Sequence, residues 1–441
     1  MLEKVKTIFA GQGFKRYFQN TSWLMGERIL RMAIALTVGV LVTRYLGPEE
    51  FGVLSYAQSF VGLFAAFSSL GLTDIVTREL VKDKTDHYPL LGTAFILQTA
   101  GSVLIMLCLG LYVALNDHGS LTNTIILILG AMTFLQSFNV ITTYFNSQVQ
   151  SKWAIIPAFI GIVFSSILKL VGIAQDAPLL YFVWTLFFDV AFLTLGQLYF
   201  YKRAGFTLLE WKFNAALAKR LLRDAWPLIL STIVISIYMK IDQVMIKEML
   251  SSASVGQYAA AVRLSEAWYF IPMIICTSLF PAILNAREQN EKLYSTRLSN
   301  LYDLMVILGL SIVLPVLLLA DWGITFLYGP DFDQTASVLK IHIWAGIFVF
   351  LGVANQKWFI SENLQSYNVV CLGLGMVLNI GLNLLWIPSY GIQGAALATL
   401  CSQAFASVLA PLFFAKTRPS FYRMLRSLLF VNILKKAFQG K

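Results

Sequence analysis

Residues 20–60 read NTSWLMGERILRMAIALTVGVLVTRYLGPEEFGVLSYAQSF and decide the fold. The stretch begins with an apolar run long enough to cross a bilayer, since a spanning helix needs about 20 mostly apolar residues. Glu27, Arg28 and Arg31 lie close to the start of this run. A charge within the hydrocarbon costs about 2.5–3.5 kcal/mol even on insertion scales, so such residues usually have a function. The stretch therefore predicts a membrane span that carries functional charges.

The composition of the whole chain agrees with a membrane protein. Of its 441 residues, 58% are hydrophobic and 13% are charged, whereas soluble domains average about 25% charged residues. The mean hydropathy is +0.71. The net charge of +10 does not indicate nucleic acid as a partner, because the basic residues lie between apolar segments instead of on a soluble domain.

Apolar runs of spanning length recur along the chain and predict an all-α polytopic protein with twelve transmembrane helices. No cleavable signal peptide is expected, because residues 1–19 are basic and lack a signal-type apolar core. The twelve runs cover approximately 22–45, 52–72, 89–115, 121–145, 153–174, 178–201, 226–249, 257–283, 301–328, 337–360, 366–387 and 391–415.

The basic residues between these runs predict the orientation. With the N-terminus inside, 25 of the 33 Lys and Arg residues fall in cytoplasmic segments, 3 in outer segments and 5 within spans. Cytoplasmic loops carry the excess of positive charge, so both termini are predicted to be cytoplasmic.

The runs divide into two lobes of six spans. The predicted order is a cytoplasmic amphipathic segment, an N-terminal lobe, a basic cytoplasmic connector, a C-terminal lobe and a basic amphipathic tail. Basic amphipathic segments bind the anionic inner leaflet, which makes membrane lipids partners of the connector and the tail. The five regions cover residues 1–21, 22–201, 202–225, 226–415 and 416–441.

The two lobes resemble each other in sequence. Aligning Gly52 with Gly256 gives an offset of 204 residues, and the same offset pairs Leu24 with Leu228. Two halves with the same starting topology form a parallel repeat around an axis along the membrane normal. Ordinary tight-turn chemistry is the alternative, because Gly and Pro suit such corners in any case.

Charged residues inside the spans are the strongest candidates for a functional site. We expect a central cationic cavity that attracts an anion, with Arg and Lys as diphosphate ligands. Mutual neutralisation between packed helices is the alternative, because the charges nearly balance. The cations are Arg28, Arg31, Lys169, Lys240 and Arg263, and the anions, as charge partners or ion-coupling groups, are Glu27, Asp189, Asp242 and Glu266.

Uncharged polar residues on other spans could contact sugar hydroxyls. These are Gln136 and Asn139 on the fourth span and Asn355 and Gln356 on the tenth. Asn379 and Asn383 on the eleventh span belong to the same class. Hydrogen bonds between helices are the other role open to all of them.

Several kinds of chemistry are not indicated. The chain has no G-x-x-x-x-G-K-[ST] loop for nucleotide hydrolysis. Its three histidines, at 87, 118 and 342, do not have metal-ligand spacing. The sequence therefore predicts a transporter with no enzymatic activity, no resident cofactor and no metal site.

Four stretches together resemble a known family. Residues 20–60, IYMKIDQVMI (237–246), VGQYAAAVRLSEAWYFIP (255–272) and IPSYGIQGAALAT (387–399) resemble the O-antigen and polysaccharide repeat-unit flippases of the multidrug/oligosaccharidyl-lipid/polysaccharide (MOP) superfamily. The resemblance implies two six-helix lobes and export of an undecaprenyl-diphosphate-linked oligosaccharide by alternating access, in O-antigen and lipopolysaccharide biosynthesis. It also implies the bacterial inner membrane, and a polysaccharide polymerase and chain-length regulator as partners.

The resemblance carries over to individual residues and leaves alternatives open. Lipid II flippases of the superfamily use Arg residues in the first and eighth spans, which correspond to Arg28 or Arg31 and to Arg263. Twelve spans instead of fourteen argue against lipid II itself as the substrate. A cation-coupled drug exporter and a non-transporting scaffold are the other hypotheses. Energy would come from the membrane potential or from a proton or Na⁺ at Asp242, Glu266 or Asp189.

Overall fold

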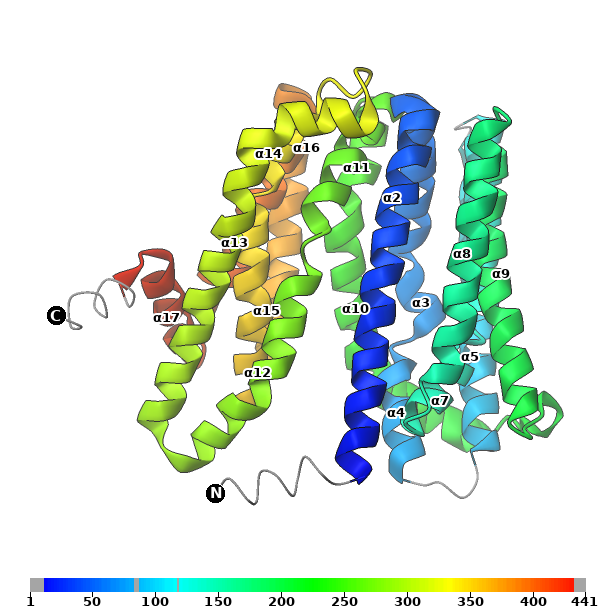
Figure 1. Ribbon diagram of the computed structural model, residues 1–441, viewed down its shortest axis with the longest axis horizontal. Coiled ribbons are helices and arrows are strands. Elements are labelled where there is room, and N and C mark those ends of the chain that lie inside the picture. The colour runs from blue at the N-terminus through cyan, green and yellow to red at the C-terminus, as the bar shows by residue number, and fades with distance from the viewer. Residues whose placement is uncertain (1–11, 83–86, 117–118, 432–441) are drawn as a thin grey trace. The chain divides into compact units, whose positions relative to one another are not determined.

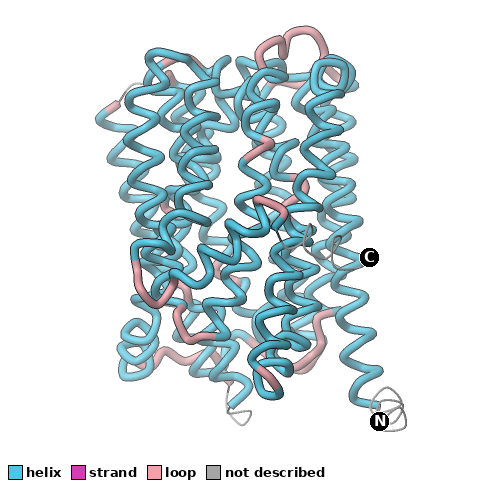
Figure 2. Tube along the Cα trace, turned by 90° about the vertical axis from the view of Figure 1, so that its left-hand side faces the viewer, coloured by secondary structure: helices cyan, strands magenta, loops and turns pink. Residues whose placement is uncertain are grey.

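The computed structural model describes residues 12–82, 87–116 and 119–431, with side chains from residue 30 onward except that of Ala65. These residues form helices joined by short turns, and no strand occurs among them (Figure 2). The all-α class predicted from the sequence is therefore confirmed. Figure 1 labels the helices in chain order.

Ten helical stretches of the described chain are long and apolar enough to cross a membrane, which makes the protein a multi-pass membrane protein. The sequence predicts twelve such stretches. The difference arises at two glycines, where a single long helix leaves the helical conformation. In α2 (Gln12–Leu63) the break is at Gly47 (φ 67, ψ 175), and in α16 (Gln365–Ala404) it is at Gly391 (φ 60, ψ −144).

The break in α16 is a reversal of the chain. A Cβ placed on Gly394 would collide with the carbonyl oxygen of Trp386. In a straight helix, eight residues are about 12 Å apart along the axis, so this contact requires the segment after Gly391 to fold back. The eleventh and twelfth predicted spans are thus the two limbs of α16, the second continuing through η2 (Phe405–Leu409) and η3 (Ala410–Phe413).

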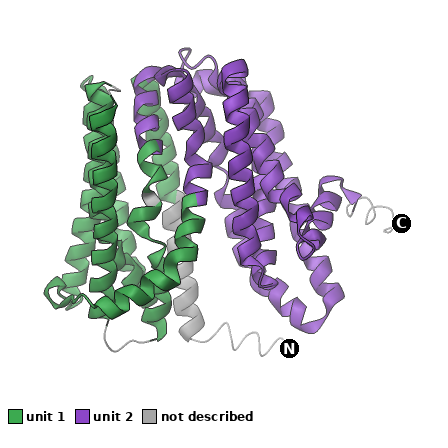
Figure 3. Cartoon of the chain, turned by 180° about the vertical axis from the view of Figure 1, so that it is seen from behind, with its two compact units in different colours: residues 1–46, 60–233 green, residues 47–59, 234–441 purple. Residues whose placement is uncertain are grey.

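The chain forms two compact units, drawn in different colours in Figure 3. Unit 1 contains residues 1–46 and 60–233, and unit 2 contains residues 47–59 and 234–441. Segment 47–59, the start of the second predicted span, thus belongs to the unit formed by the C-terminal half. The domain boundaries predicted from sequence stay a prediction.

Unit 1 is a bundle built around an aromatic and aliphatic core. Leu91, Ile141, Phe145 and Tyr201 are buried in this core, which draws on α4, α5, α7, α9 and α10. Besides parts of α2 and of α10 (Ala215–Met249), the unit contains α3 (Ala65–Ser69), α4 (Leu72–Lys82), α5 (Tyr88–Leu115), α6 (Ser120–Gln136), α7 (Asn139–Ser147), α8 (Lys152–Ala174), α9 (Leu179–Arg203) and η1 (Leu208–Glu210).

The predicted basic connector is docked onto unit 1. The indole N–H of Trp211 donates to Tyr201 Oη at 3.1 Å, and the backbone N–H of Asn214 donates to Thr93 Oγ1 at 3.1 Å. From Ala215 the chain continues as α10 without a break into the seventh predicted span. The connector therefore has a structural role in unit 1.

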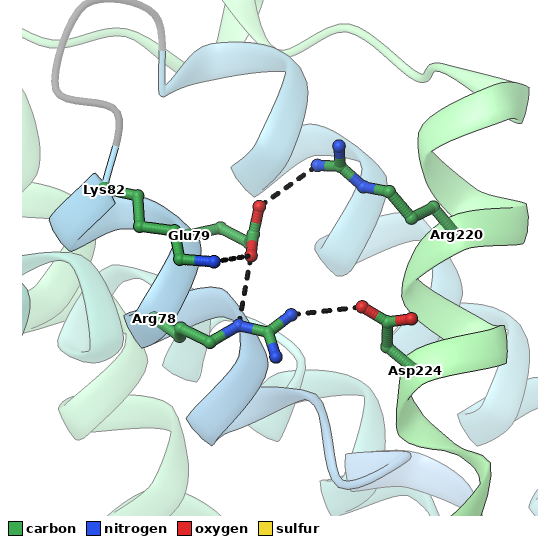
Figure 4. A network of polar contacts seen from close by, with 5 residues as sticks. All are labelled: Arg78, Glu79, Lys82, Arg220 and Asp224. Carbon is green, nitrogen blue, oxygen red and sulfur yellow. Dashed lines mark hydrogen bonds and ion pairs between the residues drawn. The ribbon is translucent and has the colours of Figure 1, made fainter.

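An ion network joins α4 to the beginning of α10 (Figure 4). Arg78 bridges Asp224 and Glu79, both at 3.1 Å, and Arg220 reaches Glu79 at 3.2 Å. Lys82 adds a contact to Glu79 at 3.7 Å. The hydrogen bonds to Asp224 and Glu79 raise the pKa of the Arg78 guanidinium, so this group stays charged.

Unit 2 has a second core, formed where α12, α13, α15, η2 and α17 meet. Tyr302, Met305, Phe350 and Met424 are buried in it. Figure 1 shows α12 and α13 as a hairpin joined at Asn290. The helices that lie wholly in unit 2 are α11 (Ser252–Glu266), α12 (Phe270–Gln289), α13 (Glu291–Tyr328), α14 (Thr335–His342), α15 (Ala345–Ser361), α16 with η2 and η3, and α17 (Arg418–Leu428).

Interruptions within the second and eighth predicted spans recur at the repeat offset. The second span breaks at Phe64, between α2 and α3, and the eighth breaks at residues 267–269, between α11 and α12. Adding 204 to Phe64 gives Trp268, which lies within the second break. Pro272 follows this break by a few residues, which agrees with proline's incompatibility with a helix interior.

Candidate functional site

The first predicted charges lie in the N-terminal half of α2. Glu27 and Arg28 are in its helical backbone, but their side chains lie outside the described residues. Arg31, one turn further on, is an exposed residue. Its interactions include electrostatic contact with Asp189 of α9.

Asp189 is the centre of a charge group in unit 1. Lys169 of α8 and Arg31 of α2 interact with it electrostatically. The carboxylate faces α8 at Gly161, where a Cβ would lie 3.5 Å from Asp189 Oδ1. A Cβ at this distance would be in ordinary van der Waals contact, so the carboxylate lies where α8 and α9 pack together. The structure brings together three residues that the sequence only placed on separate spans, and their net charge is positive.

Asp242 of α10 is buried in unit 2 and surrounded by polar groups. Tyr258 Oη of α11 donates to Asp242 Oδ2 at 2.7 Å, and Asn383 Nδ2 of α16 donates to Oδ1 at 2.7 Å. Thr399 Oγ1, on the second limb of α16, lies 2.5 Å from Oδ2. We call Asp242, Tyr258, Asn379, Asn383 and Thr399 the Asp242 cage. The aspartate is 6% exposed.

The Asp242 cage contains two buried amide atoms without a hydrogen-bond partner among the described residues, the nitrogen Asn379 Nδ2 and the oxygen Asn383 Oδ1. Asn383 Nδ2 also donates to Asn379 Oδ1 at 3.2 Å. Among the described residues, the buried Asn383 Oδ1 has no hydrogen-bond partner. A buried polar atom without a partner costs about 1–3 kcal/mol, so such an atom indicates a site where a proton or cation can bind. Hard cations favour carboxylate, amide and hydroxyl oxygens, which is the donor set present here.

The remaining unit 2 charges lie near the end of α11. Glu266 is its last residue and has Lys240 and Asp242 as its electrostatic neighbours. The Arg263 guanidinium lies 5.9 Å from the ring centroid of Phe51, a cation–π contact within the unit. Arg263 is an exposed residue by its solvent-accessible surface.

The predicted sugar contacts divide into two kinds. Asn139 Oδ1 accepts from Gln197 Nε2 at 3.1 Å, and Asn355 Oδ1 accepts from Tyr302 Oη at 3.0 Å. Both hydrogen bonds join neighbouring helices, so these two amides have structural partners. Gln136 and Gln356 are exposed residues.

Gln356 lines a cavity of about 250 Å³ that lies wholly within unit 2. The walls come from α10, α15, α16, η2 and the break before α12. Its polar residues are Tyr238, Tyr269, Asn355, Gln356, Asn368, Gln403 and Ser407.

Sequence reasoning does not single out Tyr258, Thr399 or the additional cavity residues as parts of a site. One signal for the Asp242 cage was present, because Asn379 and Asn383 are four residues apart and must share a helix face. The pairing of that face with Asp242 depends on how α10, α11 and α16 pack, which no local pattern contains.

Comparison with curated proteins gives two archaeal relatives over part of the chain. The probable flippase AglR of Haloferax volcanii is 30% identical over 186 residues. The probable low-salt glycan biosynthesis flippase Agl15 of the same organism is 27% identical over 178 residues. Each match covers 39% of this chain and 37% of the relative, so the chain spans little more than a third of these proteins.

Solved structures match over nearly the whole chain. An inward-facing multidrug resistance MATE family transporter of the MOP superfamily has a TM-score of 0.72 at 15% identity, covering 92% of this chain and 96% of that one. The lipid II flippase MurJ, in an inward closed conformation, has a TM-score of 0.70 at 14% identity, covering 93% and 92%. At these identities the likeness concerns the fold, which this chain shares with MOP transporters.

The family match rests on the sequence itself. The family described as polysaccharide biosynthesis protein matches residues 17–287, which is more than half of the chain. This region includes the first three of the four stretches on which the resemblance to polysaccharide exporters depends. The protein therefore belongs to the polysaccharide biosynthesis protein family.

Proposed function

We propose that this protein is a flippase that moves an undecaprenyl-diphosphate-linked oligosaccharide from the inner to the outer leaflet. The substrate would be an O-antigen or another surface-polysaccharide repeat unit, and the protein would act by alternating access in a bacterial inner membrane. The family supports a role in polysaccharide biosynthesis, and the two partial relatives are named as flippases.

One observation carries the choice of substrate: cations with described side chains, from the set predicted to lie within the membrane, occur on the spanning helices of both units. These are Arg31 and Lys169 in unit 1 and Lys240 and Arg263 in unit 2. Cations within spans are costly unless they have partners or line a polar cavity. Arginine binds a diphosphate through paired hydrogen bonds, and lysine adds a compact charge. The diphosphate is the charged part of the proposed substrate.

The proposed path uses twelve spans and two cytoplasmic termini. Splitting the ten long stretches at Gly47 and Gly391 gives twelve segments. Arg28 and Arg31 would capture the diphosphate from the cytoplasmic side, and Lys169, Lys240 and Arg263 would hold it in the outward-open state. The lipid tail would remain in the bilayer. A polysaccharide polymerase and chain-length regulator would receive the exported unit.

We further propose that a proton or Na⁺ binds in the Asp242 cage and couples an ion gradient to transport. The support is a buried carboxylate with an amide oxygen beside it that lacks a partner among the described residues. The membrane potential is a second source of energy, worth about 2.3 kcal/mol per charge per 100 mV.

The test replaces single arginines in cells that depend on this protein for surface polysaccharide. Arg31→Gln and Arg263→Gln should each lower surface polysaccharide about tenfold or more, because a hydrogen bond to a charged group is worth about 1.5–3 kcal/mol. Arg426→Gln is the matched control, since Arg426 is exposed on α17 beyond the predicted spans. Normal polysaccharide at normal protein level in both test variants would reject the proposal.

A cation-coupled drug exporter is the second candidate, favoured by the MATE fold neighbour. Such a pump would bind cationic compounds through carboxylates. Of the nine intramembrane charges predicted here, five are positive, which favours an anionic substrate. Resistance to cationic dyes that depends on Asp189 or Glu266, with unchanged polysaccharide, would support the exporter instead. A scaffold predicts a third result, in which the arginine variants affect only assembly with polysaccharide enzymes.

A further inference from the structure

The cavity in unit 2 has walls of two chemical kinds, and no charged residue lines it among those that the structure describes. Three aromatic residues line it: Tyr238 of α10, Tyr269 before α12 and Phe359 of α15. Side-chain amides come from α15 and α16, and the remaining lining is aliphatic or small. At about 250 Å³ it lies below the range of about 300–1,000 Å³ that is usual for drug-sized ligands. It therefore suits one small, neutral and partly polar group.

Several of these polar groups are not used by the protein. Gln403 is 9% exposed and Ser407 is 8% exposed. Within the described part of the chain, neither side chain makes a hydrogen bond to another residue, and the same holds for Gln356 and Asn368. Buried polar groups normally have partners. Gln403 and Ser407 are therefore buried polar groups without partners, and they lie at one cavity with the half-buried Asn368 and the exposed Gln356, which is the chemistry of a binding site.

The local backbone accounts for one wall. Residues 405–409 form a π-helix, η2, directly after α16, and Ala406 and Ser407 of η2 line the cavity. A π-turn is rare and occurs frequently at functional sites, because its extra residue changes the register of the helix. Gly352 of α15 lies opposite, where a Cβ would come within 2.8 Å of Ser407 Oγ. The absence of a side chain at Gly352 therefore allows Ser407 to pack closely against α15.

We propose that this cavity binds one neutral sugar ring of the lipid-linked oligosaccharide. The inference rests on the proposed flippase function and adds a place for the sugar, separate from the cations that would bind the diphosphate. A side-chain amide donates hydrogen bonds through its NH₂ group and accepts them through its oxygen, so it can pair with two neighbouring sugar hydroxyls. Tyrosine supplies an apolar ring face with a polar tip.

The lining disfavours other ligands. A diphosphate would require Arg or Lys, and a cationic drug would require a carboxylate, but in the described part of the chain no charged residue lines the cavity. A lipid tail would leave the free amides of Gln356, Asn368 and Gln403 without partners, at a cost of about 1–3 kcal/mol for each group. A sugar hydroxyl satisfies these amides directly.

The test uses the full-length purified protein and saturation-transfer NMR. The probes are the methyl glycosides of glucose, galactose and N-acetylglucosamine, with inorganic pyrophosphate as a separate probe of the cations. We expect ring-proton signals from at least one glycoside. Gln403→Leu and Asn368→Leu should each weaken that binding about tenfold, by loss of one hydrogen bond. Pyrophosphate binding should not change in either variant.

Gln365→Leu is the matched control, because Gln365 is exposed at the start of α16 and does not line the cavity. If Gln403→Leu does not fold, Asn368→Leu decides the question, since Asn368 is only half-buried. The sugar site is overturned if no glycoside binds the wild type, or if the folded variants bind it unchanged. If pyrophosphate does not bind the wild type, this result counts against the flippase proposal. The sugar site is then still decided by the glycoside result alone.

Discussion

Gly52 and Gly256 make reciprocal contacts with each other's helix within unit 2. A Cβ on Gly52 would collide with the carbonyl oxygen of Ser252, and a Cβ on Gly256 would collide with that of Pro48. Gly52 and Gly256 differ by 204 residues, and so do Pro48 and Ser252. Reciprocal contact between equivalent residues is the signature of a two-fold relationship. The contact has the symmetry that the sequence repeat predicts.

This contact predicts an unusual sensitivity to one methyl group. Gly52→Ala or Gly256→Ala should lower stability by about 1–3 kcal/mol, because the added Cβ meets backbone that cannot rotate away. The melting temperature of the purified protein measures this effect. Gly381→Ala is the matched control, since nothing lies within 4 Å of a Cβ at that position of α16. Equal melting temperatures for all three variants would mean that the helices separate readily at this contact.

Much of the fold could be predicted from local pattern, and the exceptions have physical reasons. Apolar run length identifies the spanning helices, because the bilayer sets a minimum length. The reversal at Gly391 was predicted as a boundary near residue 391, since glycine permits a positive φ. The attachment of segment 47–59 to unit 2 could not be predicted, because it depends on which backbones approach across Gly52 and Gly256.

The candidate site shows the same division. Charge within an apolar run identifies Lys169, Asp189 and Asp242 as costly and therefore informative. The sequence could not show that Tyr258 and Thr399 hold Asp242, because hydroxyl residues are common in spans and their partners come from other helices. The cavity was harder to predict, since its amides are spread from residue 355 to residue 403.

The Asp242 cage predicts an ion-dependent stability. A bound ion stabilises the folded protein by an amount that grows with its concentration relative to the dissociation constant. If Na⁺ binds, the melting temperature should rise in NaCl compared with KCl at equal ionic strength. If a proton binds, the temperature should instead rise on acidification without Na⁺. Asp242→Asn should abolish either response.

The control for this prediction is Asp321→Asn, because Asp321 is exposed and pairs with Lys340 away from the Asp242 cage. This variant should keep the full response of the wild type. A response that survives in Asp242→Asn would place the coupling ion elsewhere, with Glu266 as the next carboxylate to replace.

In the charge group of unit 1, removing the anion and removing a cation should have opposite effects on the affinity for pyrophosphate. Asp189→Asn removes the anion beside Arg31 and Lys169, so inorganic pyrophosphate should bind roughly three- to tenfold more tightly, as expected for charges several ångströms apart in a partly screened site. Lys169→Gln should weaken pyrophosphate binding by a similar factor.

Isothermal titration calorimetry measures both affinities. Asp176→Asn is the control, because Asp176 lies in an exposed turn after α8. Weaker binding in Asp189→Asn would mean that the carboxylate orients the cations and does not compete with the ligand.

The network between α4 and α10 predicts a small stabilisation that salt removes. Arg78 is 49% exposed and Asp224 is 34% exposed, and exposed ion pairs contribute about 0–1 kcal/mol. Asp224→Asn should therefore lower the melting temperature slightly at low salt, and the difference should vanish at about 1 M NaCl, where the screening length is about 3 Å.

Arg223→Gln is the control, because Arg223 is exposed next to the network and no ion pair involves it within the described residues. A loss that persists at high salt would mean that Asp224 holds α10 by its hydrogen bond to Arg78, since hydrogen-bond geometry is not screened.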